Sequence, residues 1–223
     1  MQAIQNLYNK LIKSFYKNRD SKKSLDMSKY MKDKFPYLGI PKPARALLQK
    51  EFLKEEKKKN KIDWSLVFEL FNKEEREFQY LAIDYLIALK SVLVKEDIRH
   101  IEKLIVTKSW WDTVDALDSL IGILLAEEPK LISKIDEYIK SDNIWLKRVA
   151  IDCQLTFKEN TNTEILSRAI LGSLGTKEFF INKAIGWSLR EYSKTNQKWV
   201  RDFIDKHKDK MDKLSVREGS KYL

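Results

Sequence analysis

The sequence is poor in several residues on which common classes of protein depend. It has one cysteine, Cys153, which excludes an internal disulfide and suggests a reducing compartment. Six glycines and four prolines among 223 residues leave few sites for tight turns, which disfavours a many-stranded β fold. No apolar run approaches the roughly 18 residues of a membrane span, and residues 1–8 lack the order of a signal peptide. These features predict a soluble, cytoplasmic, largely helical protein.

Residues that carry common enzyme chemistry are equally scarce. The two histidines, His100 and His207, have neither metal-ligand spacing nor a nearby nucleophile, which disfavours metal-dependent hydrolysis and Ser–His or Cys–His catalysis. Gly172 and Gly175 lack the lysine and the strand context of a phosphate-binding loop. The motifs of zinc deaminases are missing as well. We therefore expect no metal, no nucleotide and no other cofactor.

Positive charge is present in excess and is unevenly distributed. The chain carries a formal net charge of +10, and residues 1–61 alone hold 17 basic and 6 acidic side chains. Residues 62–150 sum to −5 and residues 151–223 to +4, so basic ends flank an acidic middle. A basic surface of this kind is typical of a protein that binds DNA or RNA, although lysine-rich chains can also be merely well solvated.

Aromatic anchors recur at a fixed period along the chain. Phe78, Trp111, Trp145 and Phe180 are spaced by 33, 34 and 35 residues, and each begins an apolar segment with helical spacing. Other amphipathic stretches lie between these segments, so each repeat is a pair of helices. A unit of about 34 residues cannot bury its apolar face alone and must stack on its neighbours. The period predicts an all-α, HEAT-like helical-repeat solenoid with a concave basic DNA-binding face.

The same pattern suggests how the chain is organised. We predict a single α-solenoid domain over residues 1–223. Basic helices and a loop would occupy residues 1–50, the helix-pair repeats residues 51–206, and a tail or helix residues 207–223. The segment Gly39–Arg45, with its two prolines, is expected to break the helix between the first two parts. Ser109, Ser141 to Asn143 and Thr176 are expected to cap helices.

Charged residues interrupt the repeat in two places. Four positions after its anchor, one repeat carries Asp115 where the other three have small or branched apolar residues. A carboxylate at such a position costs several kcal/mol unless it is paired or hydrogen-bonded. One repeat later stands Arg148, which is a plausible partner; its counterparts in the other repeats are Leu81, Val114 and Lys183. A buried structural ion pair and a functional site both remain open for Asp115 and Arg148.

Tryptophans accumulate on the second helices of the repeats. Trp110, Trp111, Trp145 and Trp187 all lie there, and Trp187 stands seven positions after its anchor. Aromatic side chains at helical spacing usually belong to a core, which we expect for Trp145 and Phe180. A tryptophan beside a carboxylate and an arginine in a groove also suits stacking on a base or a sugar, or holding a cation.

Three segments of the chain together resemble a known family. They are residues 107–115 (TKSWWDTVD), 141–148 (SDNIWLKR) and 177–192 (KEFFINKAIGWSLREY). They are similar to the DNA alkylation repair glycosylases of the AlkD type, and the resemblance extends from about Tyr30 to Asn196. It implies a HEAT-like solenoid, in agreement with the period, and duplex DNA containing alkylated purines as the partner. We also expect a monomer that associates with the nucleoid when it is bound to DNA.

The resemblance assigns roles to individual residues. It places the chemistry on Trp111, Asp115 and Arg148, with Trp187 and Tyr30 completing an aromatic cleft. Further contacts to DNA are expected from Trp110, Lys147, Lys183, Arg190, Lys42 and Arg45. Two departures from the family pattern bear on DNA binding: Ala46 follows Arg45 where a second arginine is usual, and Thr156 stands where a basic residue is expected, with Lys158 as its candidate replacement.

The reaction implied is hydrolysis of the N-glycosidic bond of purines alkylated at N3 or N7. The alkylated base already carries a positive charge and can leave as a neutral molecule, so no general acid is required. Asp115 would oppose the oxocarbenium ion that develops on the sugar and orient the attacking water. Two alternatives remain: a non-catalytic HEAT-repeat module that binds distorted or branched DNA, and a HEAT scaffold that binds proteins.

Overall fold

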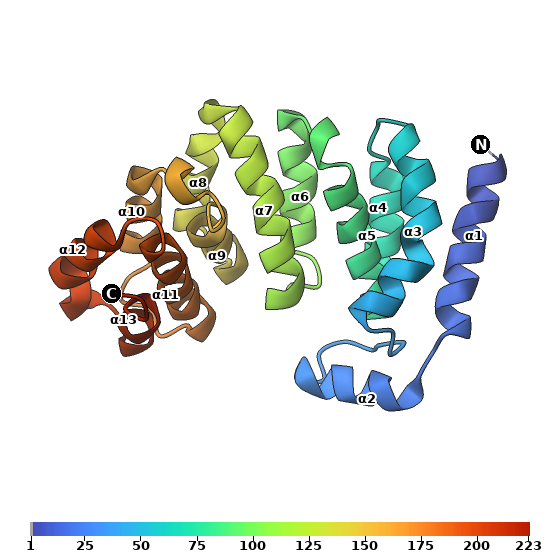
Figure 1. The fold of residues 1–223 in the computed structure, drawn as a ribbon, viewed down its shortest axis with the longest axis horizontal. Coiled ribbons are helices and arrows are strands. Elements are labelled where there is room, and N and C mark those ends of the chain that lie inside the picture. The colour runs from blue at the N-terminus through green and yellow to red at the C-terminus, as the bar shows by residue number, and fades with distance from the viewer. Residues whose placement is uncertain (1) are drawn as a thin grey trace. The chain divides into compact units, whose positions relative to one another are not determined.

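The computed structural model of the chain describes residues 2–223, and every side chain of that range except those of residues 2–5 and 129. Across this range the regular structure is helical (Figure 1). None of the helices in it is long and apolar enough to cross a membrane. The all-α class predicted from the sparse glycine and proline is confirmed.

Thirteen α-helices occur in residues 2–223. They are α1 (Gln2–Lys17), α2 (Ser21–Tyr30), α3 (Lys42–Lys58), α4 (Trp64–Asn72), α5 (Arg76–Ala88), α6 (Ile98–Ile105), α7 (Trp111–Glu127), α8 (Ile132–Lys140), α9 (Ile144–Asp152), α10 (Thr163–Leu171), α11 (Phe179–Ser193), α12 (Gln197–His207) and α13 (Lys213–Gly219). Short 3-10 turns connect several of them, at η1 (Lys90–Val92), η2 (Lys95–Asp97), η3 (Pro129–Leu131), η4 (Lys158–Asn160) and η5 (Lys208–Lys210).

The chain forms two compact units, one that ends at Leu93 and one over Val94–Leu223. The first unit contains α1 to α5, and the second contains α6 to α13. The single-domain organisation expected from the sequence stays a prediction.

The repeat inferred from the aromatic anchors is present as helix pairs. Phe78, Trp111, Trp145 and Phe180 each lie in the first turns of the second helix of a pair, in α5, α7, α9 and α11. The pairs α4–α5, α6–α7 and α8–α9 pack together, and α9 also packs on α7, α10 and α11. This stacking buries the apolar faces that a single pair would leave exposed. The HEAT-like helical-repeat fold is confirmed.

Helix starts are fixed by short polar side chains. Asp63 accepts a hydrogen bond from the third residue of its helix, and Asn143 accepts one from the amide of Trp145. Each of these bonds satisfies an N–H group that has no partner within the helix. Ser109, expected as a cap, instead donates its hydroxyl to the carbonyl of Ile105 at 2.6 Å and so closes the preceding helix.

A loop in the first unit requires a glycine. Gly39 has a φ of +88°, and a Cβ placed there would lie 2.1 Å from the carbonyl oxygen of Asp20. The buried Glu77 carboxylate accepts hydrogen bonds from the backbone amides of Leu38, Gly39 and Ile40 at 2.9, 2.8 and 3.0 Å. The loop therefore folds inward onto α5.

The helix break expected over residues 39–45 is shorter than the sequence suggested. The helix α3 begins at Lys42, and Pro43 lies in its first turn. Because the N–H groups of a first turn have no partner within the helix, a proline is tolerated there.

Candidate active site

The helix α7 carries two of the predicted site residues on one face. Trp111 is its first residue, and Asp115 follows four residues later, so the two side chains are neighbours on the helix surface. Both are half-buried. At the position that Asp115 occupies in its repeat, Val149 and Ala184 of the following repeats are fully buried. The Asp115 side chain keeps 15% of its surface exposed, so this side chain is in part open to solvent.

Asp115 and Arg148 form a two-point ion pair between α7 and α9. The Nε atom of Arg148 lies 2.6 Å from Oδ1 of Asp115, and its Nη2 atom lies 2.8 Å from Oδ2. Two parallel N–H···O bonds of this kind fix the orientation of both groups as well as their distance. The sequence prediction that Arg148 is the partner of Asp115 agrees with this geometry.

Arg148 makes three further contacts that hold its guanidinium in place. Its Nη1 atom donates to the backbone carbonyl of Phe180 at 2.7 Å, and its Nη2 atom lies 3.4 Å from Oδ2 of Asp152. The Trp187 ring lies beside the guanidinium, with its centroid 6.0 Å from Cζ. The arginine side chain is only 4% exposed. The structure therefore brings together Asp115, Arg148 and Trp187 from three successive second helices.

Two buried aspartates complete the cluster, and neither was a site candidate. Asp118 lies one turn after Asp115 on α7, and Asp152 one turn after Arg148 on α9. Carboxylate oxygens of Asp115, Asp118 and Asp152 lie within 4.8 Å of one another. The sequence signal for them was their spacing: Asp118 follows Asp115 by three residues, and Asp152 follows Arg148 by four, so each lies on the same helix face as its neighbour. The Arg148 guanidinium supplies the positive charge for this cluster.

Burial sets the protonation of these groups. Desolvation raises the pKa of Asp118 well above its usual value, and the nearby Asp152 and Asp115 carboxylates raise it further. Burial also raises the pKa of Asp152 to about 6, against the opposing effect of Arg148. The pKa of Asp115 is raised by burial and lowered by the hydrogen bonds from Arg148, with burial the larger effect. Asp152 and Asp115 raise the pKa of Arg148, outweighing desolvation, so the guanidinium remains charged.

Trp110 belongs to a packed aromatic cluster. Its ring centroid lies 5.7 Å from that of Trp145 and 4.9 Å from that of Phe180, both in edge-to-face arrangement. Trp145 is buried, as expected for a repeat anchor. The cluster joins the starts of α7, α9 and α11 and so supports the segment on which Trp111 stands. A contact of Trp110 with DNA stays a prediction.

Two of the predicted basic residues on α11 are paired within the protein. Lys183 and Arg190 lie 3.1 and 3.0 Å from the same oxygen of Glu218, which is on α13. Lys221 lies 2.9 Å from that oxygen too, and the hydrogen bonds from Lys221 and Lys183 lower the pKa of Glu218 to about 2. The sequence analysis missed Glu218, because nothing in the local pattern relates α13 to α11.

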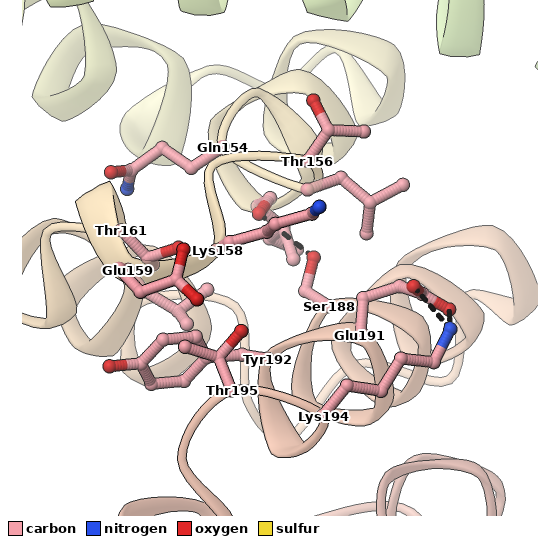
Figure 2. Close-up of a pocket in the computed structure, with 13 residues that line it drawn as sticks. Gln154, Thr156, Lys158, Glu159, Thr161, Ser188, Glu191, Tyr192, Lys194 and Thr195 are labelled. Carbon is pink, nitrogen blue, oxygen red and sulfur yellow. Dashed lines mark hydrogen bonds and ion pairs between the residues drawn. The ribbon is translucent and has the colours of Figure 1, made fainter.

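Lys147 and the two departures from the family pattern lie on α9 and just after it. Lys147 is half-buried on α9, and Thr156 and Lys158 are exposed. Thr156 and Lys158 line a pocket of about 390 Å³ formed by the segment after α9 together with α10 and α11 (Figure 2). Ser188 of α11 also lines this pocket.

The remaining predicted residues, Tyr30, Lys42 and Arg45, belong to the first unit. Tyr30 ends α2, is 68% exposed, and lines a small pocket of about 280 Å³ with Tyr37 and Tyr80. Lys42 is exposed at the start of α3.

Arg45 is held inside the first unit. It is buried, with Nε 3.5 Å from Asp84 and Cζ 4.6 Å from the ring centroid of Tyr80. The described contacts of its guanidinium are internal, so its role toward DNA stays a prediction.

Comparisons with known proteins identify the family of the chain. The family model described as "DNA alkylation repair enzyme" matches residues 11–223. A solved structure, described as a predicted DNA alkylation repair enzyme from Enterococcus faecalis, is similar at a TM-score of 0.84 and 37% identity, over 92% of this chain and 97% of the other. No curated protein matches the chain at a significant level. With a family match over almost its whole length, the chain belongs to the DNA alkylation repair enzymes.

Proposed function

We propose that the protein is a DNA glycosylase that hydrolyses the N-glycosidic bond of positively charged N3- or N7-alkylated purines in duplex DNA. The observation that carries the proposal is Asp115, whose side chain is partly exposed and whose carboxylate is fixed at two points by the buried Arg148. We infer that it acts as a monomer on DNA in the cytoplasm, at the nucleoid. The net charge of +10 supports a polyanionic partner.

The chemistry of the lesion explains why so few groups suffice. A purine alkylated at N3 or N7 carries a formal positive charge, and cleavage of its bond to the sugar releases it as a neutral base. The electrons of that bond leave with the base, so positive charge develops on the deoxyribose as an oxocarbenium ion, which a water then captures. The step requires negative charge near the sugar and a base for the water proton.

Asp115 suits both requirements. The two hydrogen bonds from Arg148 use one lone pair on each oxygen, and each oxygen keeps a second lone pair for a water or for the sugar. Burial makes this carboxylate more basic than a fully solvated one. One preorganised electrostatic group of this kind contributes about 10² to 10³ in rate.

Trp111 and Trp187 would line the place where the sugar reacts. Trp111 is one helical turn from Asp115, and Trp187 lies beside the guanidinium of Arg148. The face of a tryptophan ring attracts positive charge, by about 0.5–2 kcal/mol. Both rings would therefore favour the cationic sugar over its neutral precursor.

A direct assay tests the proposal. Duplex DNA with a single N7-methylguanine or N3-methyladenine is incubated with the protein, and abasic sites are revealed by alkaline cleavage. We expect release of the base and an intact abasic strand before alkali, because no lysine belongs to the proposed constellation to form a Schiff base. Borohydride should therefore trap no protein on the DNA. Absence of base release, with DNA binding retained, would favour the non-catalytic DNA-binding module.

A further inference from the structure

A line of buried polar contacts runs behind Asp115. Asp115 receives two hydrogen bonds from Arg148, and the Nη2 atom of Arg148 faces Oδ2 of Asp152 at 3.4 Å. The other oxygen of Asp152 accepts a hydrogen bond from the Ser188 hydroxyl at 2.7 Å. Ser188 itself is on α11, where it lines the pocket described above (Figure 2). The line thus connects α7, α9 and α11.

The buried Asp152 carboxylate lowers the stability of the folded protein. It is fully buried, and its Oδ2 atom accepts no hydrogen bond among the described residues, so its compensation there is the charge of Arg148 alone. A buried carboxylate with incomplete compensation destabilises a protein relative to an apolar residue of similar size. At the same register position, the first repeat carries the fully buried Tyr85. Packing alone therefore does not explain Asp152.

We propose that Asp152 is a positioning residue for base removal, which holds the guanidinium of Arg148 from behind and offsets its charge. The inference rests on the proposed glycosylase function. With Nη1 on the Phe180 carbonyl and Nη2 facing Asp152, the guanidinium presents its Nε–Nη2 edge to Asp115 in one orientation.

The charges of the cluster support the second part of this role. Arg148 is positive, Asp115 and Asp152 are negative when ionised, and burial raises the pKa of Asp118, which favours its uncharged form. The charges of Arg148 and Asp115 alone would sum to zero. With Asp152 ionised, the three groups carry one net negative charge, and Asp115 is the member of the cluster that reaches solvent. Through Asp115, that charge would act on the sugar in the proposed reaction.

The kinetic test uses Asp152→Asn, which keeps the size of the side chain and removes its charge. Single-turnover excision of N7-methylguanine at saturating enzyme should slow by about tenfold, with the dissociation constant for lesion DNA changed less than about twofold. Ser188→Ala should slow it less, in the same direction. Cys153→Ala is the matched control, because Cys153 is the next residue in the sequence and is also buried. This variant should excise the base at the wild-type rate per folded molecule. The melting temperature of Asp152→Asn should not fall.

A second measurement reports position without reference to activity. In the wild type, the Arg148 Nη protons should give separate, slowly exchanging ¹H–¹⁵N signals, assigned by their loss in Arg148→Lys. In Asp152→Asn these signals should broaden or merge, because the guanidinium rotates more freely. The proposal requires both the slower excision and the freer guanidinium, and it is overturned if either is missing or if the loss of rate tracks a loss of folded protein. If the wild type excises no base at all, the proposed function fails, while the guanidinium signals still decide whether Asp152 orders Arg148.

Discussion

Arg148 and Asp115 meet edge to edge, with Nε and Nη2 of the arginine 2.6 and 2.8 Å from the two carboxylate oxygens. The pair joins the second helices of two successive repeats, α7 and α9. Arg148 is buried and Asp115 is partly exposed, so the negative member of the pair is the one that is in part open to solvent.

Asp115→Asn should lower excision by at least about 10²-fold and leave DNA affinity nearly unchanged, because it removes the charge opposed to the oxocarbenium ion and adds no repulsion toward phosphates. Single-turnover rates and a binding titration on lesion DNA measure the two effects. Asp112→Asn, three residues earlier on α7, removes the same charge and should excise at a rate close to wild type. Unfolding of Asp115→Asn with normal excision per folded molecule would identify the pair as purely structural.

Stability should depend on pH through Asp152. The pKa of Asp152 is about 6 in the folded protein and 3.8 in a solvated chain, so the unfolded state loses this proton first as pH rises. Below about pH 4, Asp152 is protonated in both states and its burial carries no charge penalty. As pH rises through about 6, the buried carboxyl ionises and the free energy of unfolding falls. Asp152→Asn should melt at least about 2 °C above the wild type at pH 8, and the two should converge near pH 4. A lower melting temperature at pH 8 would contradict this reasoning.

Glu77→Gln should destabilise the protein by about 1–3 kcal/mol, because an amide oxygen replaces a carboxylate that accepts three buried backbone N–H groups. Urea denaturation followed by circular dichroism measures this difference. Glu74→Gln, on an exposed neighbour, provides the baseline and should unfold at the wild-type midpoint. Equal midpoints for both variants would show that the loop at Gly39 does not depend on Glu77.

Residues 1–61 should supply much of the sequence-independent affinity for DNA, since they hold more than the whole net charge of the chain. Replacing Lys10, Lys13 and Lys17 of α1 by glutamine should flatten the slope of log affinity against log salt, by up to about 0.9 for each phosphate that is no longer neutralised. The same replacement of three exposed lysines near the C-terminal end, Lys198, Lys206 and Lys210, is the control. An unchanged slope in the α1 variant alone would place the basic DNA-binding surface elsewhere.

The repeat could be predicted from the sequence because its signal is local and recurs. Trp111 and Trp145 mark the start of equivalent helices, and a polar residue at one register position, Asp115, stands out against apolar counterparts. The partner Arg148 followed from the same register, one repeat later. Equivalent positions on stacked helices lie close in space, so sequence register was sufficient to pair them.

Other features depend on contacts between residues that do not occupy equivalent positions of the repeat. Glu77 folds back on the loop that contains Gly39, and Glu218 reaches α11 from the last helix. The burial of Asp118 and Asp152 also follows from packing of α7, α9 and α11 rather than from spacing along one helix. Their altered pKa values could not be inferred until the three helices were placed together.

Glu218 is an internal counterion for Lys183 and Arg190 of α11. A single carboxylate oxygen lies within 3.1 Å of amine or guanidinium nitrogens of Lys183, Arg190 and Lys221, which is the environment that a bound phosphate would otherwise have. A DNA phosphate that approaches Lys183 or Arg190 must compete with the Glu218 carboxylate, which is held near both side chains by the fold. Glu218 therefore weakens the attraction of Lys183 and Arg190 for phosphate groups. Basic side chains without an internal acidic partner would attract a DNA strand more strongly.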